Sequence, residues 1–190
     1  MKKIVLGTLV SFALSATLFA GGIDTKSAKI EFEGYKTPAM VGTKGSFKSA
    51  KYTFGKDASS LKGQLEGAKA VISPKEVDMG ENNEIITTNI IETFFKTLND
   101  KGDIKVMFKN VVEGDNKGVI SAKITINKQS TTIPLIYTIE GDKFVAKGQL
   151  DLHHFSNSVK ALKALSDVAP GHQNISWSVV DITFSANMQK

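Results

Sequence analysis

The sequence predicts an all-β protein with two short helices, built around an eight-stranded antiparallel β-barrel with an apolar lumen. Three observations predict this class. Four consecutive segments between residues 104 and 152 carry an apolar residue at every second position, and short loops rich in Gly, Asn, Asp and Lys separate them. Further alternating segments before and after bring the total to about eight strands. Only two stretches have apolar residues at helical spacing.

The alternation over residues 104–152 gives the sheet one apolar face and one polar face. Val106 and Phe108 alternate with lysines in the first strand of this β-meander, and Ile133, Leu135 and Tyr137 take alternate positions in the third. Such a sheet must cover its apolar face, either by packing on a second layer or by curling until this face lines an interior. The interior of a closed barrel holds side chains, a ligand or both.

The N-terminal segment, residues 1–20, has the features of a secretory signal peptide. Two lysines precede an apolar run over 4–19, and small residues follow at 20–22. A membrane anchor is the alternative, but a run of about sixteen residues is shorter than the twenty or so that a spanning helix needs. We therefore expect cleavage after Ala20, within about two residues, and export to the periplasm. Residues 21–190 should form one domain without stable membrane insertion.

The composition excludes thiol chemistry and argues against a nucleic-acid partner. The sequence has no Cys, so it has neither disulfides nor thiol chemistry. Its formal charge of +5 comes from lysines spread along the whole chain, and it contains no Arg. Nucleic-acid recognition relies on Arg and on concentrated basic patches, so we expect no nucleic-acid partner. The lysines are typical of a solvated outer face.

Three strands are predicted before the first helix. The first covers 28–34, where Ala28, Ile30 and Phe32 alternate with charged residues. The second runs from 45 to 54, and a change of parity predicts a bulge or bend near residues 49–50. The third runs from 61 to 72 with a bend at Gly67, and Ser73-Pro74 ends it.

Two helices and a last strand complete the prediction. Apolar residues at helical spacing predict one helix over 86–98 and a shorter one over 159–165, with Ser156 or Asn157 as its N-cap. The first helix either covers the sheet as core or acts as a lid whose Phe94 and Phe95 contact a ligand. The strand over 175–186 could pair with the first strand.

Large apolar side chains on the inward faces are the candidate ligand-binding residues. No charged residue occupies an inward position that the pattern assigns, so the lumen should accept an apolar chain and reject an ion. Small residues such as Ala122 and Gly148 leave space beside the large ones. A barrel filled by its own side chains is the alternative. The candidates are Phe32, Met40, Phe47, Phe94, Phe95, Phe108, Leu135, Tyr137 and Trp177.

Histidines at the predicted rim offer polar contacts rather than a metal site. His153 and His154 are neighbours, so on an extended strand they point to opposite faces and cannot chelate together. They should bind a ligand head group or lie in solvent, and we expect no metal and no other cofactor. The sequence has no Gly-x-Ser-x-Gly, His-Glu-x-x-His or phosphate-loop motif. We therefore expect a protein that is not an enzyme.

The order of these elements resembles the YceI-like family over essentially the whole predicted mature chain. The segments that carry the resemblance are 72–74, 94–95, 106–108, 124–126, 132–135 and 150–155. His154 stands where the family usually has Asp, and the helix after it is longer here. The resemblance implies an extended lipocalin-like barrel, export to the periplasm, frequent homodimerisation, and binding of polyisoprenoids or other long-chain amphiphiles in the interior.

Two functions from different classes are consistent with these sequence features. The first is binding, transport or sequestration of a long-chain amphiphile (a polyisoprenoid, a quinone-like molecule, or a fatty acid or amide) in the periplasm. The second is a stress-protective or interaction protein that acts through its outer surface. An outer-membrane barrel is disfavoured because the outward positions carry Lys105, Lys109, Lys123 and Lys147, where lipid would require apolar residues.

Overall fold

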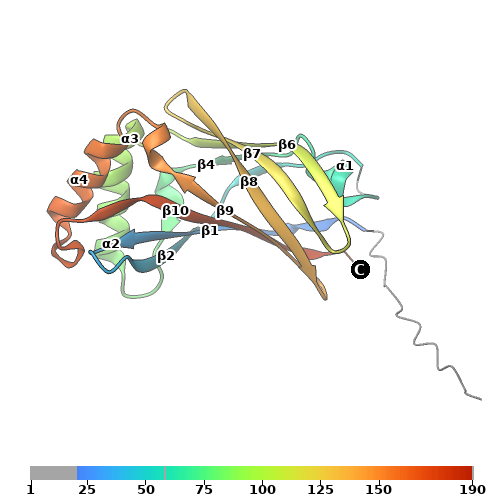
Figure 1. Ribbon diagram of the computed structural model, residues 1–190, viewed down its shortest axis with the longest axis horizontal. Coiled ribbons are helices and arrows are strands. Elements are labelled where there is room, and N and C mark those ends of the chain that lie inside the picture. The colour runs from blue at the N-terminus through green and yellow to red at the C-terminus, as the bar shows by residue number, and fades with distance from the viewer. Residues whose placement is uncertain (1–20, 58, 190) are drawn as a thin grey trace, which may run out of the picture.

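The computed structural model describes residues 21–57 and 59–189, so the predicted signal peptide lies outside the described residues. Its main element is one antiparallel sheet with the strand order β3-β4-β6-β7-β8-β9-β10-β1-β2-β5. The sheet is strongly curled, with α2 (Glu84–Asn89), α3 (Lys96–Asn99) and α4 (Ser158–Val168) at one end and α1 (Leu61–Leu65) at the other (Figure 1). The strands are β1 (Ile23–Lys36), β2 (Val41–Phe47), β3 (Lys51–Thr53), β4 (Lys69–Ile72), β5 (Val77–Asp78), β6 (Ile104–Gly114), β7 (Lys117–Ile126), β8 (Gln129–Glu140), β9 (Lys143–Asp151) and β10 (Ser176–Met188).

The helical segments lie between these strands in sequence. The α-helices are α1 (Leu61–Leu65), α2 (Glu84–Asn89), α3 (Lys96–Asn99) and α4 (Ser158–Val168), and the π-helical turn η2 (Ile90–Phe95) joins α2 to α3. Three short 3-10 turns are η1 (Pro74–Glu76), η3 (Leu152–His154) and η4 (Pro170–His172). No helix in the described residues is both long and apolar enough to cross a bilayer.

The prediction of an eight-stranded closed barrel is wrong, although an all-β fold of lipocalin-like type is confirmed. The sheet has ten strands, and within the described residues its two outermost strands, β3 and β5, do not pair with each other. The error lies in residues 45–54, which the sequence predicts as one bent strand. These residues contain the end of β2 and all of β3; β3 is one edge of the sheet, whereas β2 lies next to β5 at the other edge.

The chain crosses between the two edges of the sheet over very short distances. Only residues 48–50 separate β2 from β3, so the edges must curl close to one another, and the bend expected at 49–50 is this crossing. The Lys48 N–H donates at 2.7 Å to the carbonyl of Glu76, the last residue of η1 (Pro74–Glu76), which connects β4 to β5. The sheet is therefore curled, and short chain segments connect its two sides. Its outermost strands, β3 and β5, are not hydrogen-bonded to each other.

The predicted meander is confirmed as β6 to β9. Its inward residues are opposite one another across the ladders, as in the pairs Ile120 with Leu135 and Tyr137 with Ala146. Asn127 and Lys128 connect β7 to β8 with φ values of 47° and 64°, the left-handed pair of a type I′ hairpin turn. Alternating apolar residues and a tight turn thus define this part of the fold locally.

The first and last strands pair, as the sequence suggests. β1 lies between β10 and β2 and pairs antiparallel with both. Ile30 lies opposite Phe184 and Phe32 opposite Ile182, so the apolar positions of both strands share the inner face. This pairing joins the two ends of the described chain within one sheet.

The predicted third strand is only half a strand. Residues 61–65 form the short helix α1, whose N-cap Ser60 Oγ accepts a hydrogen bond from the Gly63 N–H at 3.0 Å. Gly67 then takes a φ of +79°, a value that favours glycine, before β4 begins. The sequence predicts this glycine at a bend in a strand, but it ends a helical turn.

Both predicted helices are confirmed, and both extend beyond the predicted residues. The segment expected over 86–98 is one continuous helix, α2-η2-α3, with a π-helical turn at its centre. The second helix, α4, contacts η2, α3 and β10, and Asn157 occupies its N-cap position. Together these helices lie against one end of the curled sheet (Figure 1).

The interior near α1 is packed with aromatic side chains. Tyr137 and Phe144 are fully buried with ring centroids 5.1 Å apart, and Phe184 lies 5.5 Å from Phe108 and 6.1 Å from Phe144. Gln64 of α1 closes this end, because its amide bonds both the N–H and the carbonyl of Ile23 at 2.6 and 2.9 Å. Side chains therefore fill this half of the interior except for a small void of about 50 Å³ beside Phe108 and Phe184.

Candidate ligand-binding cavity

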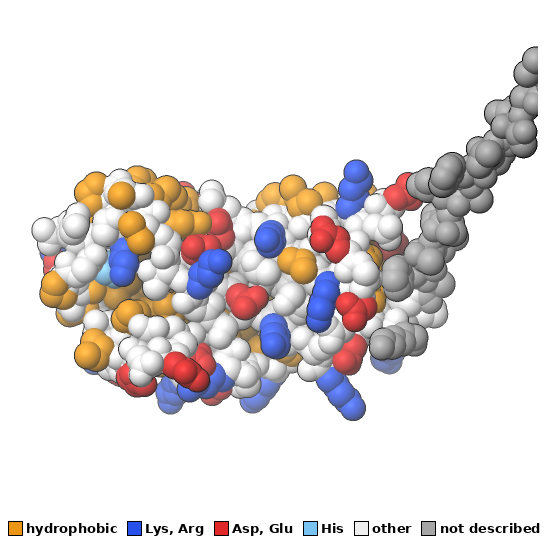
Figure 2. Space-filling view, turned by 90° about the horizontal axis from the view of Figure 1, so that it is seen from below, with side chains coloured by type: hydrophobic (Ala, Val, Ile, Leu, Met, Phe, Trp, Pro, Cys, Tyr) orange, Lys and Arg blue, Asp and Glu red, His pale blue; other side chains and the backbone are white. Residues whose placement is uncertain are grey.

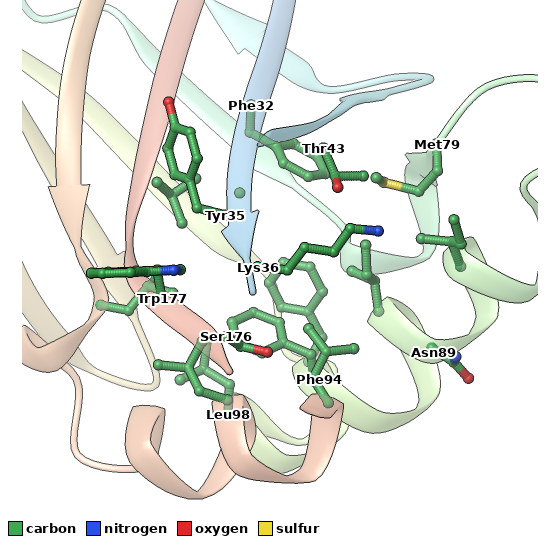
Figure 3. Close-up of a pocket in the computed structure, with 18 of the residues that line it drawn as sticks. Phe32, Tyr35, Lys36, Thr43, Met79, Asn89, Phe94, Leu98, Ser176 and Trp177 are labelled. Carbon is green, nitrogen blue, oxygen red and sulfur yellow. The ribbon is translucent and has the colours of Figure 1, made fainter. Parts of the chain in front are cut away.

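A cavity of about 410 Å³ lies between the inner face of the sheet and the helices at its other end. This volume falls within the roughly 300–1,000 Å³ that is usual for small-molecule sites. Side chains from β1, β2 and β10 face those from η2, α3 and α4 across it, as Figure 3 shows for Phe32, Phe94, Leu98 and Trp177. The helices therefore do not plug this end of the sheet but form one wall of a hollow.

The strand wall follows from alternation along β1. Ile30, Phe32, Gly34 and Lys36 occupy alternate positions, and all four line the cavity. The Phe32 ring also packs on Phe47 of β2, with centroids 5.4 Å apart. A Cβ built on Gly34 would meet no atom within 4 Å, so at this position the strand opens directly onto empty space.

The helical wall carries the π-helical turn η2. Phe94 and Phe95 are both more than nine-tenths buried, and both line the cavity with centroids 5.1 Å apart in an edge-on arrangement. A π-helical turn is rare and occurs frequently at functional sites, because its extra residue per turn changes which side chains face one side. Here it brings two adjacent aromatic rings onto the cavity.

The mouth of the cavity carries apolar side chains that remain exposed. Ile85 at the start of α2, Val168 at the end of α4 and Trp177 on β10 line the cavity while 78%, 45% and 37% exposed. Figure 2 shows hydrophobic side chains gathered at this end, whereas charged side chains are scattered over the rest of the visible face. The apolar lining thus continues outward to the molecular surface.

A chain of hydrogen bonds fixes the polar groups beside the mouth. Ser166 Oγ donates to the Leu162 carbonyl at 3.1 Å, so in its 2.8 Å contact with Ser176 it is the acceptor. Ser176 has then used its only hydrogen, and His172 Nδ1 must donate in their 2.8 Å contact. Burial, and then the charge of Lys36, lower the pKa of His172. His172 is therefore a neutral imidazole with Nε2 as an acceptor.

A second polar cluster lies on the outer face of β1, β9 and β10. Tyr35 donates to Asp181 Oδ2 at 2.6 Å, and Gln149 Nε2 donates to Asp181 Oδ1 at 2.9 Å. The hydrogen bond to the Asp181 carboxylate raises the pKa of Tyr35 to about 12, and the same bond lowers the pKa of Asp181. Since both donors are satisfied, this cluster holds three strands together.

Solved structures share this architecture. No protein-family model and no curated protein matches the chain. A polyisoprenoid binding domain from Saccharophagus degradans, implicated in plant cell wall breakdown, superimposes with a TM-score of 0.59 at 13% identity, covering 90% of this chain and 98% of the domain. BcnA from Burkholderia cenocepacia gives 0.57 at 17% identity (88% and 99%), and the YceI protein of Campylobacter jejuni gives 0.53 at 17% (82% and 90%). The chain has the YceI-like fold.

The resemblance inferred from the sequence is confirmed at the level of this YceI-like fold. Five of the candidate ligand-binding residues line the large cavity, and four do not. The five are Phe32, Phe47, Phe94, Phe95 and Trp177. Phe108 and Leu135 border a separate void of about 50 Å³, Tyr137 is fully buried in the solid end, and Met40 is 39% exposed and outside the lining.

The two histidines expected at the rim of the YceI-like fold lie away from the cavity. His153 and His154 belong to the turn η3, are exposed, and do not line the cavity. The His153 N–H donates to Asp151 Oδ1 at 3.0 Å, and this hydrogen bond is the main cause that lowers the pKa of Asp151. Within residues 21–57 and 59–189, no three His, Asp or Glu side chains are grouped as a metal site would require.

Sequence reasoning misses the polar members of the cavity wall. Lys36, His172 and Ser176 all line it. Lys36 could have been found, because the alternation of Ile30 and Phe32 continues through Gly34 to this lysine. His172 and Ser176 come together only because η4 folds back onto the start of β10, which the local pattern does not predict.

Proposed function

We propose that the chain is a member of the YceI-like family and binds a long-chain amphiphile in the cavity between the sheet and the helices. The observation that carries this proposal is an apolar hollow of about 410 Å³ that opens to the surface beside exposed apolar residues. The similarity in fold to a polyisoprenoid binding domain supports it. Five aromatic residues among those that line the cavity are the proposed contacts of the apolar chain: Phe32, Phe47, Phe94, Phe95 and Trp177.

The magnitude of apolar burial is sufficient for capture. At about 0.8 kcal/mol per methylene, a ten-carbon tail contributes about 8 kcal/mol before the entropic costs of association. About 8 kcal/mol corresponds to micromolar affinity. An unpaired ion would instead lose its hydration against this lining, so the cavity selects for molecules that are mainly hydrocarbon.

The biological setting is part of the same proposal. We propose that residues 1–20 direct export to the periplasm, that residues 21–190 act there as one ligand-binding domain, and that two copies associate as a homodimer. The role would be transport or sequestration of a polyisoprenoid, a quinone-like molecule, or a fatty acid or amide, without catalysis. Fractionation of cells that express the full chain tests the location, and sedimentation tests the dimer.

Native mass spectrometry of gently purified protein tests the binding function. We expect the folded chain to carry a copurified mass of a few hundred daltons that organic solvent extracts. The Gly34→Phe variant, whose ring would occupy part of the cavity, should carry much less of this mass. A protein that carries no such mass and binds no added amphiphile would contradict the proposal.

One observation favours the alternative of an interaction protein that acts through its outer surface. Val112, Val119 and Ile136 lie side by side on the outer faces of β6, β7 and β8, and they are 66%, 37% and 63% exposed. Apolar side chains clustered on a solvent-exposed face are typical of protein–protein contact surfaces. If this alternative is correct, Ile136→Lys should abolish the stress protection or partner binding that the protein provides in cells. Gly34→Phe should leave that function intact. The ligand-binding proposal predicts the opposite.

A further inference from the structure

The inner wall of the cavity contains a lysine whose charge the protein does not neutralise. Lys36 is the last residue of β1 and points inward with Phe32 and Gly34. Figure 3 shows its side chain extending among the apolar residues of the lining. Lys62, Lys101 and Lys163 form ion pairs with carboxylates, but among the described residues no ion pair or side-chain hydrogen bond involves the Lys36 ammonium group.

In the part of the chain that the structure describes, the cavity lining around this ammonium group carries no carboxylate. Among residues 21–57 and 59–189, those that line the cavity include neither Asp nor Glu. Burial, and then the charge of Lys36, lower the pKa of His172, which lines the cavity near this lysine. A charge that faces an apolar hollow without a counterion is costly unless water or a ligand satisfies it. The cavity lining is therefore mainly apolar, and it is positive at one point.

We infer that the cavity selects amphiphiles with an anionic head group, carboxylate or phosphate, which pairs with Lys36 while the hydrocarbon tail packs on the aromatic residues. This inference rests on the proposed function and specifies its ligand class. Apolar contacts alone do not distinguish an acid from the alcohol of equal length. Lys36 supplies the distinction, because its ammonium group donates charge-assisted hydrogen bonds to an anion.

The size of the expected preference follows from the position of the lysine. An exposed ion pair contributes little to the free energy of binding, whereas a hydrogen bond to a charged group contributes more. Because Lys36 is only half-buried, an intermediate preference of about tenfold in Kd is expected. Added salt should reduce this preference, since the pair remains near water.

Displacement of the neutral apolar dye N-phenylnaphthylamine from delipidated protein tests the inference. The probes are dodecanoic acid, dodecyl phosphate and dodecanol at neutral pH. We expect one or both anions to bind about tenfold more tightly than dodecanol. Whichever anion binds more tightly identifies the head group. In Lys36→Met this difference should disappear, because the anions lose the ammonium group that separates them from dodecanol. Lys29→Met is the matched control, because Lys29 lies on the same strand and faces solvent.

The possible outcomes separate the two proposals. If the anions and the alcohol bind equally to the unaltered protein, or if Lys36→Met retains the preference, head-group selection by Lys36 is wrong and amphiphile binding stands. If neither the dye nor any of the probes binds, both proposals are wrong. Circular dichroism of each variant confirms its fold, and Lys36→Gln provides a second neutral variant if Lys36→Met is unstable.

Discussion

Replacement of Gly34 by Phe is the sharpest test of a hollow interior. Gly34 lines the cavity from the middle of an inward-facing row, its φ is not positive, and a Cβ there would meet no atom within 4 Å. A Phe side chain at this position can therefore enter the cavity without displacing the backbone. It would occupy the space of roughly four methylenes, so at about 0.8 kcal/mol each the ligand loses about 3 kcal/mol. That loss raises Kd by about two orders of magnitude.

The same substitution should stabilise the empty protein. A glycine inside a strand costs about 0.5–1 kcal/mol relative to alanine, and burial of an aromatic side chain contributes about 1.5–3 kcal/mol. The free energy of unfolding of delipidated Gly34→Phe should therefore rise by about 2–4 kcal/mol. Denaturant titration measures this change, and displacement of N-phenylnaphthylamine measures affinity.

Gly34→Ala is the matched control for Gly34→Phe. Alanine removes the conformational cost of glycine in the strand, but its single methyl group leaves the cavity almost unchanged. Ligand affinity should therefore stay within about threefold of that of the parent protein. Loss of stability in Gly34→Phe would show that the space beside this residue is already filled. Unchanged ligand affinity would show that the ligand binds elsewhere. Either result would refute the reasoning.

Three further predictions concern the packed end, the mouth and the outer face. Phe144→Ala should lower the free energy of unfolding by about 3–5 kcal/mol in denaturant titration, because this fully buried ring packs on Tyr137 and Phe184. Since folding lowers the pKa of His172, its neutral form stabilises the protein above about pH 6.5, and this contribution is lost as pH falls through the lower folded pKa. The free energy of unfolding should therefore fall less in His172→Gln than in the parent protein between about pH 7 and pH 5. Equal losses in the two proteins would show that folding does not lower the pKa of His172. Asp181→Asn should return the pKa of Tyr35 from about 12 toward its usual 10, and the difference in near-ultraviolet absorbance against Tyr35→Phe follows that single phenol.

The regular part of this fold could be predicted from sequence because its determinants are local. Alternation and tight turns define β6 to β9, and helical spacing defines α4 and the α2-η2-α3 segment. The division of residues 45–54 between opposite edges of the sheet could not be predicted in this way. Its cause is the pairing of β2 with β5 and of β3 with β4, which depends on residues about thirty positions and about seventeen positions away.

The candidate site is only partly predictable because alternation identifies an inward face but not what lies opposite. Phe32 and Phe108 share the same pattern, yet Phe32 faces the helices across a hollow and Phe108 packs on Phe184. A charged substitution at Phe108 or Tyr137 would therefore test the fold and not ligand binding. Lys36 is missed because the predicted first strand ends at Gly34, two residues too early.

The position of β1 between β10 and β2 has a consequence for the order of assembly. Ile23 pairs with Met188, so the first described strand finds one of its two neighbours only when nearly the last residues of the chain are present. Contacts of such large sequence separation form slowly, because much chain entropy is lost before they are made. A nascent chain that leaves the ribosome N-terminus first must therefore keep its leading strand half-paired until synthesis is complete.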